Sequence, residues 1–146
     1  MQLPAAQTFA LGETVYLSPG FGPYLQARPR DRWDAYAARL AAVLEWGPVE
    51  SLDSLRRVLG NAVETKIDPQ HRLLIPRDLL ELADLSPDPD SESREVMVVG
   101  TGICVEIWNP ANLAEHEREL QSRLKTVWND VSTLMRATPA APATAT

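Results

Sequence analysis

The chain has 146 residues, a net charge of −6 and 45% apolar residues, an ordinary composition for one globular domain or for two small halves that share a core. It has no stretch of the ~18 uninterrupted apolar residues that a membrane helix needs, and no signal-peptide pattern. The single cysteine, Cys104, and two distant histidines, His71 and His116, argue against a disulfide and against a zinc site. We therefore expect a soluble cytoplasmic protein with no metal, no other cofactor and no membrane partner.

The first half of the chain predicts a hairpin followed by helices. Residues 15–18 (VYLS) and 23–27 (PYLQA) have the composition of strands, and PGFG between them is typical of a turn. A helix follows with an apolar face, and a bridging helix over roughly residues 51–63 carries a second apolar face. The residues on the first of these faces are Trp33, Tyr36, Ala37, Leu40 and Leu44.

The second half opens with KIDPQHRLLIP, residues 66–76, in which Asp68 and Arg72 flank a turn before an apolar run. Residues 85–94 (LSPDPDSESR) predict a surface loop, and residues 95–99 and 103–108 predict a second hairpin. Apolar positions between residues 113 and 134 fall on one stripe, which predicts one long amphipathic helix. The low-complexity tail, residues 137–146, is expected to be disordered.

The two halves repeat one plan. We predict an α+β fold in which residues 1–48 and 64–128 are two repeats joined by a linking helix at 49–63, with the last helix reaching about residue 136. Their β elements should interleave into a shared barrel-like core with helices outside, because one repeat alone has too little core. The aligned pairs, at offsets of 81 and then 72 residues, are Val15 with Val96, Tyr24 with Val105, Pro29 with Pro110, Leu3 with Ile75 and Pro4 with Pro76.

The charge distribution limits the kind of nucleic-acid contact that is possible. Residues 63–146 hold eight Lys and Arg against fourteen Asp and Glu, whereas residues 1–62 hold six of each. A protein that binds DNA non-specifically is usually basic, because its affinity comes largely from neutralising phosphates. Any DNA contact must therefore come from a local patch or from several copies acting together.

Three segments of the chain together carry a family resemblance: LSPGFGPYLQARPRDRWDAYAARL (17–40), AVETKIDPQHRLLIPRDLLELADL (62–85) and EVMVVGTGICVEIW (95–108). The last of them contains VVG at 98–100 and EIW at 106–108. Together these segments resemble the MraZ family, whose two halves are each a SpoVT/AbrB-type domain. The family pattern is D-x-x-G-R, then an apolar run that usually ends in Pro, and later VVVG and EIW.

The resemblance implies a DNA-binding transcriptional regulator of the cell-division and cell-wall gene cluster, located at the nucleoid. It implies binding to direct repeats in promoter double-stranded DNA, assembly into a ring-shaped homo-oligomer, and DNA contact by Asp68 and Arg72. The chain departs from the pattern at His71, where the family usually has Gly, which adopts positive φ at little cost. Only Met1 and Gln2 precede Leu3, so we expect the chain to start within its first repeat and to lack that repeat's D-x-x-x-R turn.

Plainer interpretations stay open for these residues. Asp68 and Arg72 also fit a structural ion pair worth about 0.5 kcal/mol. The four tryptophans fit core or subunit-interface positions better than base-stacking platforms, and the carboxylates lack the partners of an enzyme site, so we expect no enzyme activity. The alternative functions are a ring-forming protein-interaction module that has lost DNA binding, and an antitoxin-like AbrB relative.

Overall fold

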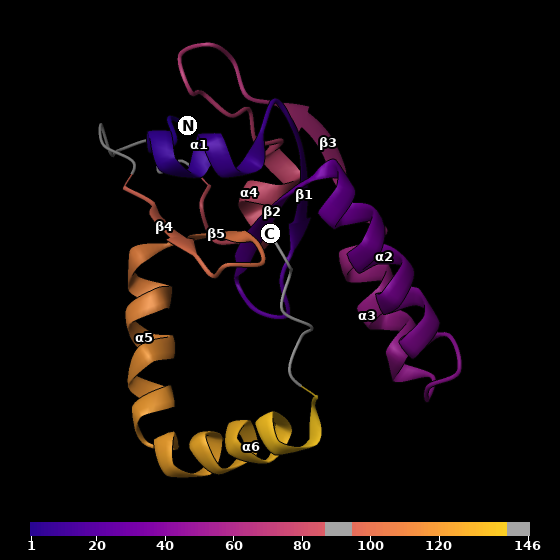
Figure 1. Cartoon of the computed structure of the whole chain (residues 1–146). Helices are drawn as coiled ribbons and strands as arrows, with labels where there is room; N and C mark the ends of the chain where they lie inside the picture. The colour runs from indigo at the N-terminus through magenta and orange to yellow at the C-terminus, as the bar shows by residue number, and fades with distance from the viewer. Residues whose placement is uncertain (87–94, 140–146) are drawn as a thin grey trace, which may run out of the picture. The chain divides into compact units, whose positions relative to one another are not determined.

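A computed structural model describes residues 1–86 and 95–139 of the chain (Figure 1). The chain divides into two compact units, Met1–Asn112 and Leu113–Thr146. Most of the predicted loop at 85–94 and of the predicted disordered tail lies outside the described residues. The first unit contains the whole β-sheet, and the second contains the C-terminal helical segment.

The α+β class is confirmed, and the strands form one antiparallel sheet of five in the order β3-β1-β2-β5-β4. The predicted hairpins are present, and the first hairpin lies between strands of the second half, because β1 pairs with β3 and β2 pairs with β5. The strands are β1 (Thr14–Pro19), β2 (Tyr24–Pro29), β3 (Val63–Lys66), β4 (Met97–Gly100) and β5 (Val105–Trp108).

The barrel-like closure predicted from the sequence is wrong, because the sheet is open along β3 and β4. Closure would require β3 to pair with β4. Instead, the chain leaves β3 and turns back on itself, so that Ile67 bridges Leu73 and Arg72 bridges Gln2. The chain after β3 thus pairs with the N-terminal segment rather than with the far edge of the sheet.

Two short helices precede the hairpins, and longer helices follow them. The single long helix predicted between residues 113 and 134 is wrong, since it is interrupted at residues 122–123, where the Ser122 hydroxyl donates to the Glu119 carbonyl at 2.7 Å and competes with the helical backbone bonds. The bridging helix also ends earlier than predicted. The helices are α1 (Ala5–Leu11), α2 (Arg30–Leu44), α3 (Glu50–Val58), α4 (Arg77–Leu82), α5 (Pro110–Gln121) and α6 (Leu124–Ala137).

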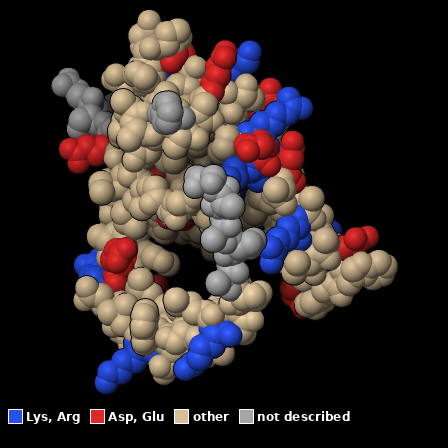
Figure 2. Space-filling model, in the orientation of Figure 1, with Lys and Arg blue, Asp and Glu red and all other residues tan. Residues whose placement is uncertain are grey.

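Charged side chains of both signs are interspersed over the face drawn in Figure 2, and no broad basic surface is visible there. One basic side chain close to the start of α2 is not at the surface. Arg28 lies on β2 and is buried, with its guanidinium 3.7 Å from the centroid of the Tyr36 ring and its Nη1 donating to Gln26 Oε1 at 2.9 Å. Arg28 is therefore an internal packing residue, and any basic contact surface must be sought elsewhere.

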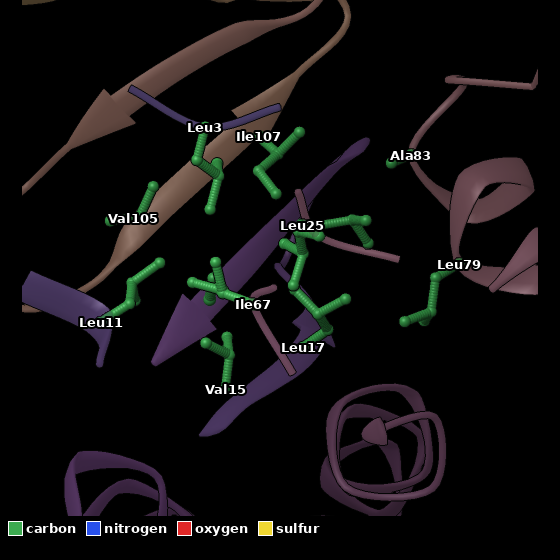
Figure 3. Close-up of a cluster of buried hydrophobic side chains, with 12 residues drawn as sticks. Leu3, Leu11, Val15, Leu17, Leu25, Ile67, Leu79, Ala83, Val105 and Ile107 are labelled. Carbon is green, nitrogen blue, oxygen red and sulfur yellow. The ribbon is translucent and has the colours of Figure 1, made fainter. Parts of the chain in front are cut away.

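The hydrophobic core lies on one face of the sheet (Figure 3). Alternate residues of the strands point into it, as the two-residue period of a half-buried strand requires. Ile67 and Leu73 belong to the same cluster, so the core holds both arms of the turn at residues 68–72. The cluster consists of Leu3, Leu11, Val15, Leu17, Leu25, Ala27, Ile67, Leu73, Leu79, Ala83, Val105 and Ile107.

Leu17→Ala should lower the free energy of unfolding by about 2–5 kcal/mol, because Leu17 is fully buried in β1 and the substitution leaves a cavity. Urea denaturation monitored by circular dichroism measures this loss. Ile103→Ala, at an exposed position between β4 and β5, is the control and should change stability by less than about 0.5 kcal/mol. Equal effects of the two substitutions would contradict the placement of the core.

Candidate nucleic-acid interface

The candidate interface is a tight hairpin turn over residues 68–72. Its ends are fixed by backbone bonds from Asp68 N to the Arg72 carbonyl at 3.0 Å and from His71 N to the Asp68 carbonyl at 2.9 Å. His71 has φ of +61°, so it adopts the left-handed conformation that closes three-residue hairpin loops. The positive-φ turn is therefore retained with histidine in place of glycine, at a cost in backbone energy.

The Asp68 carboxylate accepts three hydrogen bonds from its own turn. Its Oδ1 accepts from the backbone N–H groups of Gln70 and Arg72, both at 2.9 Å, and its Oδ2 accepts from Arg72 Nε at 2.7 Å. The pKa of Asp68 is lowered, mainly by the Arg72 backbone N–H bond. Desolvation is the next largest effect and opposes this shift, and the Arg72 side chain and the Gln70 N–H lower the pKa further. The ionised carboxylate thus fixes both the backbone of the turn and the direction of the guanidinium.

The Arg72 side chain is 65% exposed although it is paired with Asp68. Only its Nε is engaged, and its two Nη groups make no hydrogen bond to any described residue. Guanidinium Nη groups in this arrangement are suited to a phosphate oxygen or to the O6 and N7 atoms of guanine. The local ion pair is confirmed, and it leaves the two Nη groups of Arg72 without a hydrogen-bond partner among the described residues.

The N-terminal residues brace the turn from one side, which sequence reasoning did not predict. Leu3 N donates to the His71 carbonyl at 2.8 Å, and Leu73 N donates to the Met1 carbonyl at 2.7 Å. On the other side, Thr65 Oγ1 donates to the Leu74 carbonyl at 3.1 Å. The offset-72 match of Leu3-Pro4 with Ile75-Pro76 was the available signal, because it placed the two segments at equivalent positions.

Other basic residues near the turn are either exposed or engaged elsewhere. Arg77, at the start of α4, pairs with Glu81 at 3.1 Å and its side chain is 86% exposed, which fits a solvated surface residue.

Within residues 1–86 and 95–139, no group of three or more His, Cys, Asp and Glu side chains is placed to hold a metal ion. In the same residues, no helix is both long and apolar enough to span a bilayer.

Comparison with known proteins identifies the family. Residues 58–127 match the family model described as "MraZ protein, putative antitoxin-like". A protein of Treponema pallidum (strain Nichols), named Transcriptional regulator MraZ, is 30% identical over 132 residues, which cover 87% of this chain and 84% of the relative. The chain belongs to the MraZ family.

Further MraZ relatives carry the same name. The Transcriptional regulator MraZ of Oenococcus oeni is 32% identical over 114 residues, covering 78% of this chain and 74% of the relative. The Transcriptional regulator MraZ of Desulfitobacterium hafniense (strain Y51) is 31% identical over 119 residues, which cover 82% of this chain and 78% of the relative. This MraZ chain thus belongs to a family of transcriptional regulators rather than of enzymes, and its hairpin at 68–72 lies within the matched range.

Asp68→Asn should remove a pH-dependent part of the stability of this MraZ chain. Since the native pKa of Asp68 is lowered, the ionised form stabilises the fold above the unfolded pKa of about 3.9, and this contribution is lost as the pH falls through the native value. The difference in unfolding free energy between wild type and Asp68→Asn should be constant from pH 5 to 7. It should shrink below about pH 4. Urea titrations at each pH measure it, and a difference that grows on acidification would contradict the assignment.

His71→Gly should stabilise the protein by about 0.5–1 kcal/mol, because glycine adopts φ of +61° without the steric cost that histidine bears. Thermal and urea unfolding measure the gain. Gln70→Gly is the matched control: Gln70 is next in the same turn but has no positive φ, so this change should destabilise. Destabilisation by His71→Gly would show that the histidine side chain makes a contact that outweighs the strain.

Proposed function

We propose that this MraZ chain regulates transcription by binding double-stranded DNA through the hairpin at 68–72, at the nucleoid in the cytoplasm. One observation carries the proposal: an exposed guanidinium, that of Arg72, projects from a turn whose backbone and side chain are both fixed by Asp68. A donor held in one direction loses little side-chain entropy when it binds, which favours specific contact over transient attraction.

Arg72 is assigned the direct contact and Asp68 a bracing role. The Nη groups of Arg72 donate to a phosphate or, in pairs, to a guanine edge, whereas a carboxylate facing phosphates would be repelled. The segment from Lys66 to Arg77 holds three basic residues and one acid, so it is locally basic on a chain of net charge −6. The turn is thus a locally basic segment within a second half that is acidic as a whole.

Self-assembly supplies the affinity that one such turn lacks. A single guanidinium on an acidic protomer binds DNA weakly, but several identical turns on one ring-shaped homo-oligomer act at high effective concentration. Binding sites that recur as direct repeats in a promoter match such an assembly, and the promoter of the division and cell-wall gene cluster is the proposed target. Specificity then depends on the match between the spacing of the turns and the spacing of the repeats.

The proposed duplication accounts for the bracing of the turn. The order of α1, β1, β2 and α2 is the same as that of α4, β4, β5 and α5, with Pro4 and Pro76 preceding the first helix of each set. The two prolines have nearly the same backbone angles, φ −59° and ψ 145° against φ −57° and ψ 148°. In repeats assigned to residues 1–48 and 64–128, Met1–Leu3 is the counterpart of the strand that follows the turn, and the two pair side by side.

A protein-interaction module without DNA binding is the second candidate. It is favoured by the net charge of −6 and by the engagement of Arg72 Nε with Asp68, which partly neutralises the guanidinium. The two candidates differ in salt dependence. A DNA complex should weaken steeply as salt rises, because phosphate contacts release counterions, whereas the interaction module gives no specific complex at any salt concentration.

Arg72→Ala should lower affinity for a promoter duplex at least tenfold, in line with the loss of about 1–3 kcal/mol per protomer contact. Fluorescence anisotropy with the upstream region of the cluster, against a scrambled duplex of equal length, measures the effect. Arg72→Lys should restore only part of the affinity, because an ammonium attracts phosphate but does not reproduce the guanidinium fork.

Arg77→Ala is the control for loss of a nearby exposed positive charge, and it should change affinity much less than Arg72→Ala does. The mass of the assembly, measured by sedimentation, should be the same for wild type and both variants. Wild-type affinity in Arg72→Ala would remove Arg72 from the interface. If the wild type binds neither the promoter duplex nor the scrambled duplex, the interaction module is favoured.

A further inference from the structure

Two exposed apolar surfaces of opposite charge lie on parts of the molecule that the DNA contact does not use. The first surface lies where α2 leads into α3, and we call it the hairpin tip. It comprises Val43 at the end of α2, Trp46 and Val49 between the two helices, and Leu52 at the start of α3. Trp46 is 87% exposed, and the three residues around it are also exposed. A tryptophan left in water at the end of a helical hairpin contributes nothing to the core and is typical of a contact surface.

The second surface is the apolar face of α6, formed by Leu124, Trp128, Val131 and Met135. These residues recur at helical spacing of three or four, so they lie on one side of the helix. All four are exposed, Trp128 by 66%, and neither α5 nor α6 contains a buried residue. An amphipathic helix with its apolar face exposed requires a partner, because helical stability in proteins comes mainly from packing of that face.

The charges beside the two surfaces are complementary. Residues 43–54 hold three acids and no basic residue, and two of these acids, Glu45 and Glu50, form no ion pair with a described residue. Residues 123–136 hold three basic residues and one acid, and Lys125 and Arg136 are likewise without an ion pair among the described residues. Basic side chains are visible over α6 in Figure 2.

We propose that the apolar face of α6 in one copy of the chain packs on the hairpin tip of a second copy, with Trp128 and Trp46 as the central contacts. The occupant is a second copy because the chain itself carries an acidic apolar surface that matches a basic apolar one. Self-attraction of this kind offsets the repulsion between protomers that each carry a charge of −6. An anionic membrane would match α6 but not the acidic tip.

This contact joins different surfaces on the two partners, so each protomer keeps one free tip and one free α6. Such head-to-tail contacts continue from copy to copy and close into a ring when the rotation permits. The contact between α6 and the hairpin tip rests on the self-assembly part of the proposed function and not on DNA binding. The Arg72 hairpin takes no part in the contact and is left free for DNA.

Trp46→Ser and Trp128→Ser in the full-length chain test the contact by sedimentation velocity. The wild type should sediment as an assembly heavier than the 16.1 kDa protomer, and each variant should dissociate at least roughly tenfold more readily. Both tryptophans are exposed, so each variant should keep the circular dichroism spectrum of the folded wild type. Phe21→Ser, an exposed aromatic in the β1–β2 turn, is the matched control and should assemble as the wild type does.

Mixing the two variants gives the decisive result. Trp46→Ser keeps an intact α6 and Trp128→Ser keeps an intact tip, so an equal mixture should form a pair of protomers with one good contact and stop there. Charge provides a second test, since Glu45→Lys with Glu50→Lys should weaken assembly, and adding Lys125→Glu with Arg136→Glu should restore it. Val49→Ser replaces Trp46→Ser if the latter unfolds.

A wild type that sediments at protomer mass would overturn the proposal, and so would a Trp46→Ser variant of wild-type mass. Absence of pairing in the mixture would show that the two surfaces do not meet. Sedimentation of the wild type with phosphatidylserine vesicles, lost in Trp128→Ser, would assign α6 to a membrane instead. None of these outcomes bears on Arg72, whose loss should affect DNA affinity while leaving the assembly mass unchanged.

Discussion

The Asp68 carboxylate is the constraint on which the candidate site depends. It is a single ionised group that accepts two backbone N–H bonds and one guanidinium bond from the four residues that follow it. Two of these bonds come from the N–H groups of Gln70 and Arg72, on either side of His71 with its positive φ, and the third fixes the direction of the Arg72 guanidinium. The hydrogen bonds that shape the turn also lower the pKa of Asp68, because their donors stabilise the charged form of its carboxylate.

The sheet and its core convert this local turn into a fixed feature of the protein. Ile67 and Leu73, on either side of the turn, are buried in the cluster that β1, β2 and β5 form. The N-terminal segment then pairs with the outgoing arm. Movement of the turn would therefore require core residues to shift, and interiors packed at crystal-like density resist such shifts. A rigid turn on an acidic chain suits a protein that relies on repeated, well-placed contacts rather than on a broad basic surface.

Local patterns in the sequence predicted the elements, and longer-range pairing was the part that they could not predict. The β1–β2 and β4–β5 hairpins follow from strand composition around short turns, and the Asp68–Arg72 pair follows from a spacing of four residues around a proline. The prediction of a closed barrel was wrong because closure depends on whether the two edge strands of the sheet pair. The chain after β3 leads into a turn, and β3 does not pair with β4. At the break between α5 and α6 the Ser122 hydroxyl bonds to the Glu119 carbonyl, and a single serine is too weak a signal to predict a break within a regular apolar stripe.

The most direct test of the account asks what lies next to the turn when DNA is bound. A photoreactive benzophenone residue in place of Gln70 sits at the tip of the turn and leaves Asp68 and Arg72 intact, while the same residue in place of Arg56 on α3 serves as the reference. Irradiation with a labelled promoter duplex should cross-link the protein efficiently at position 70 and only weakly at position 56. Equal yields at the two positions, or no cross-link at position 70 under conditions where the duplex is bound, would contradict the assignment of this hairpin to DNA.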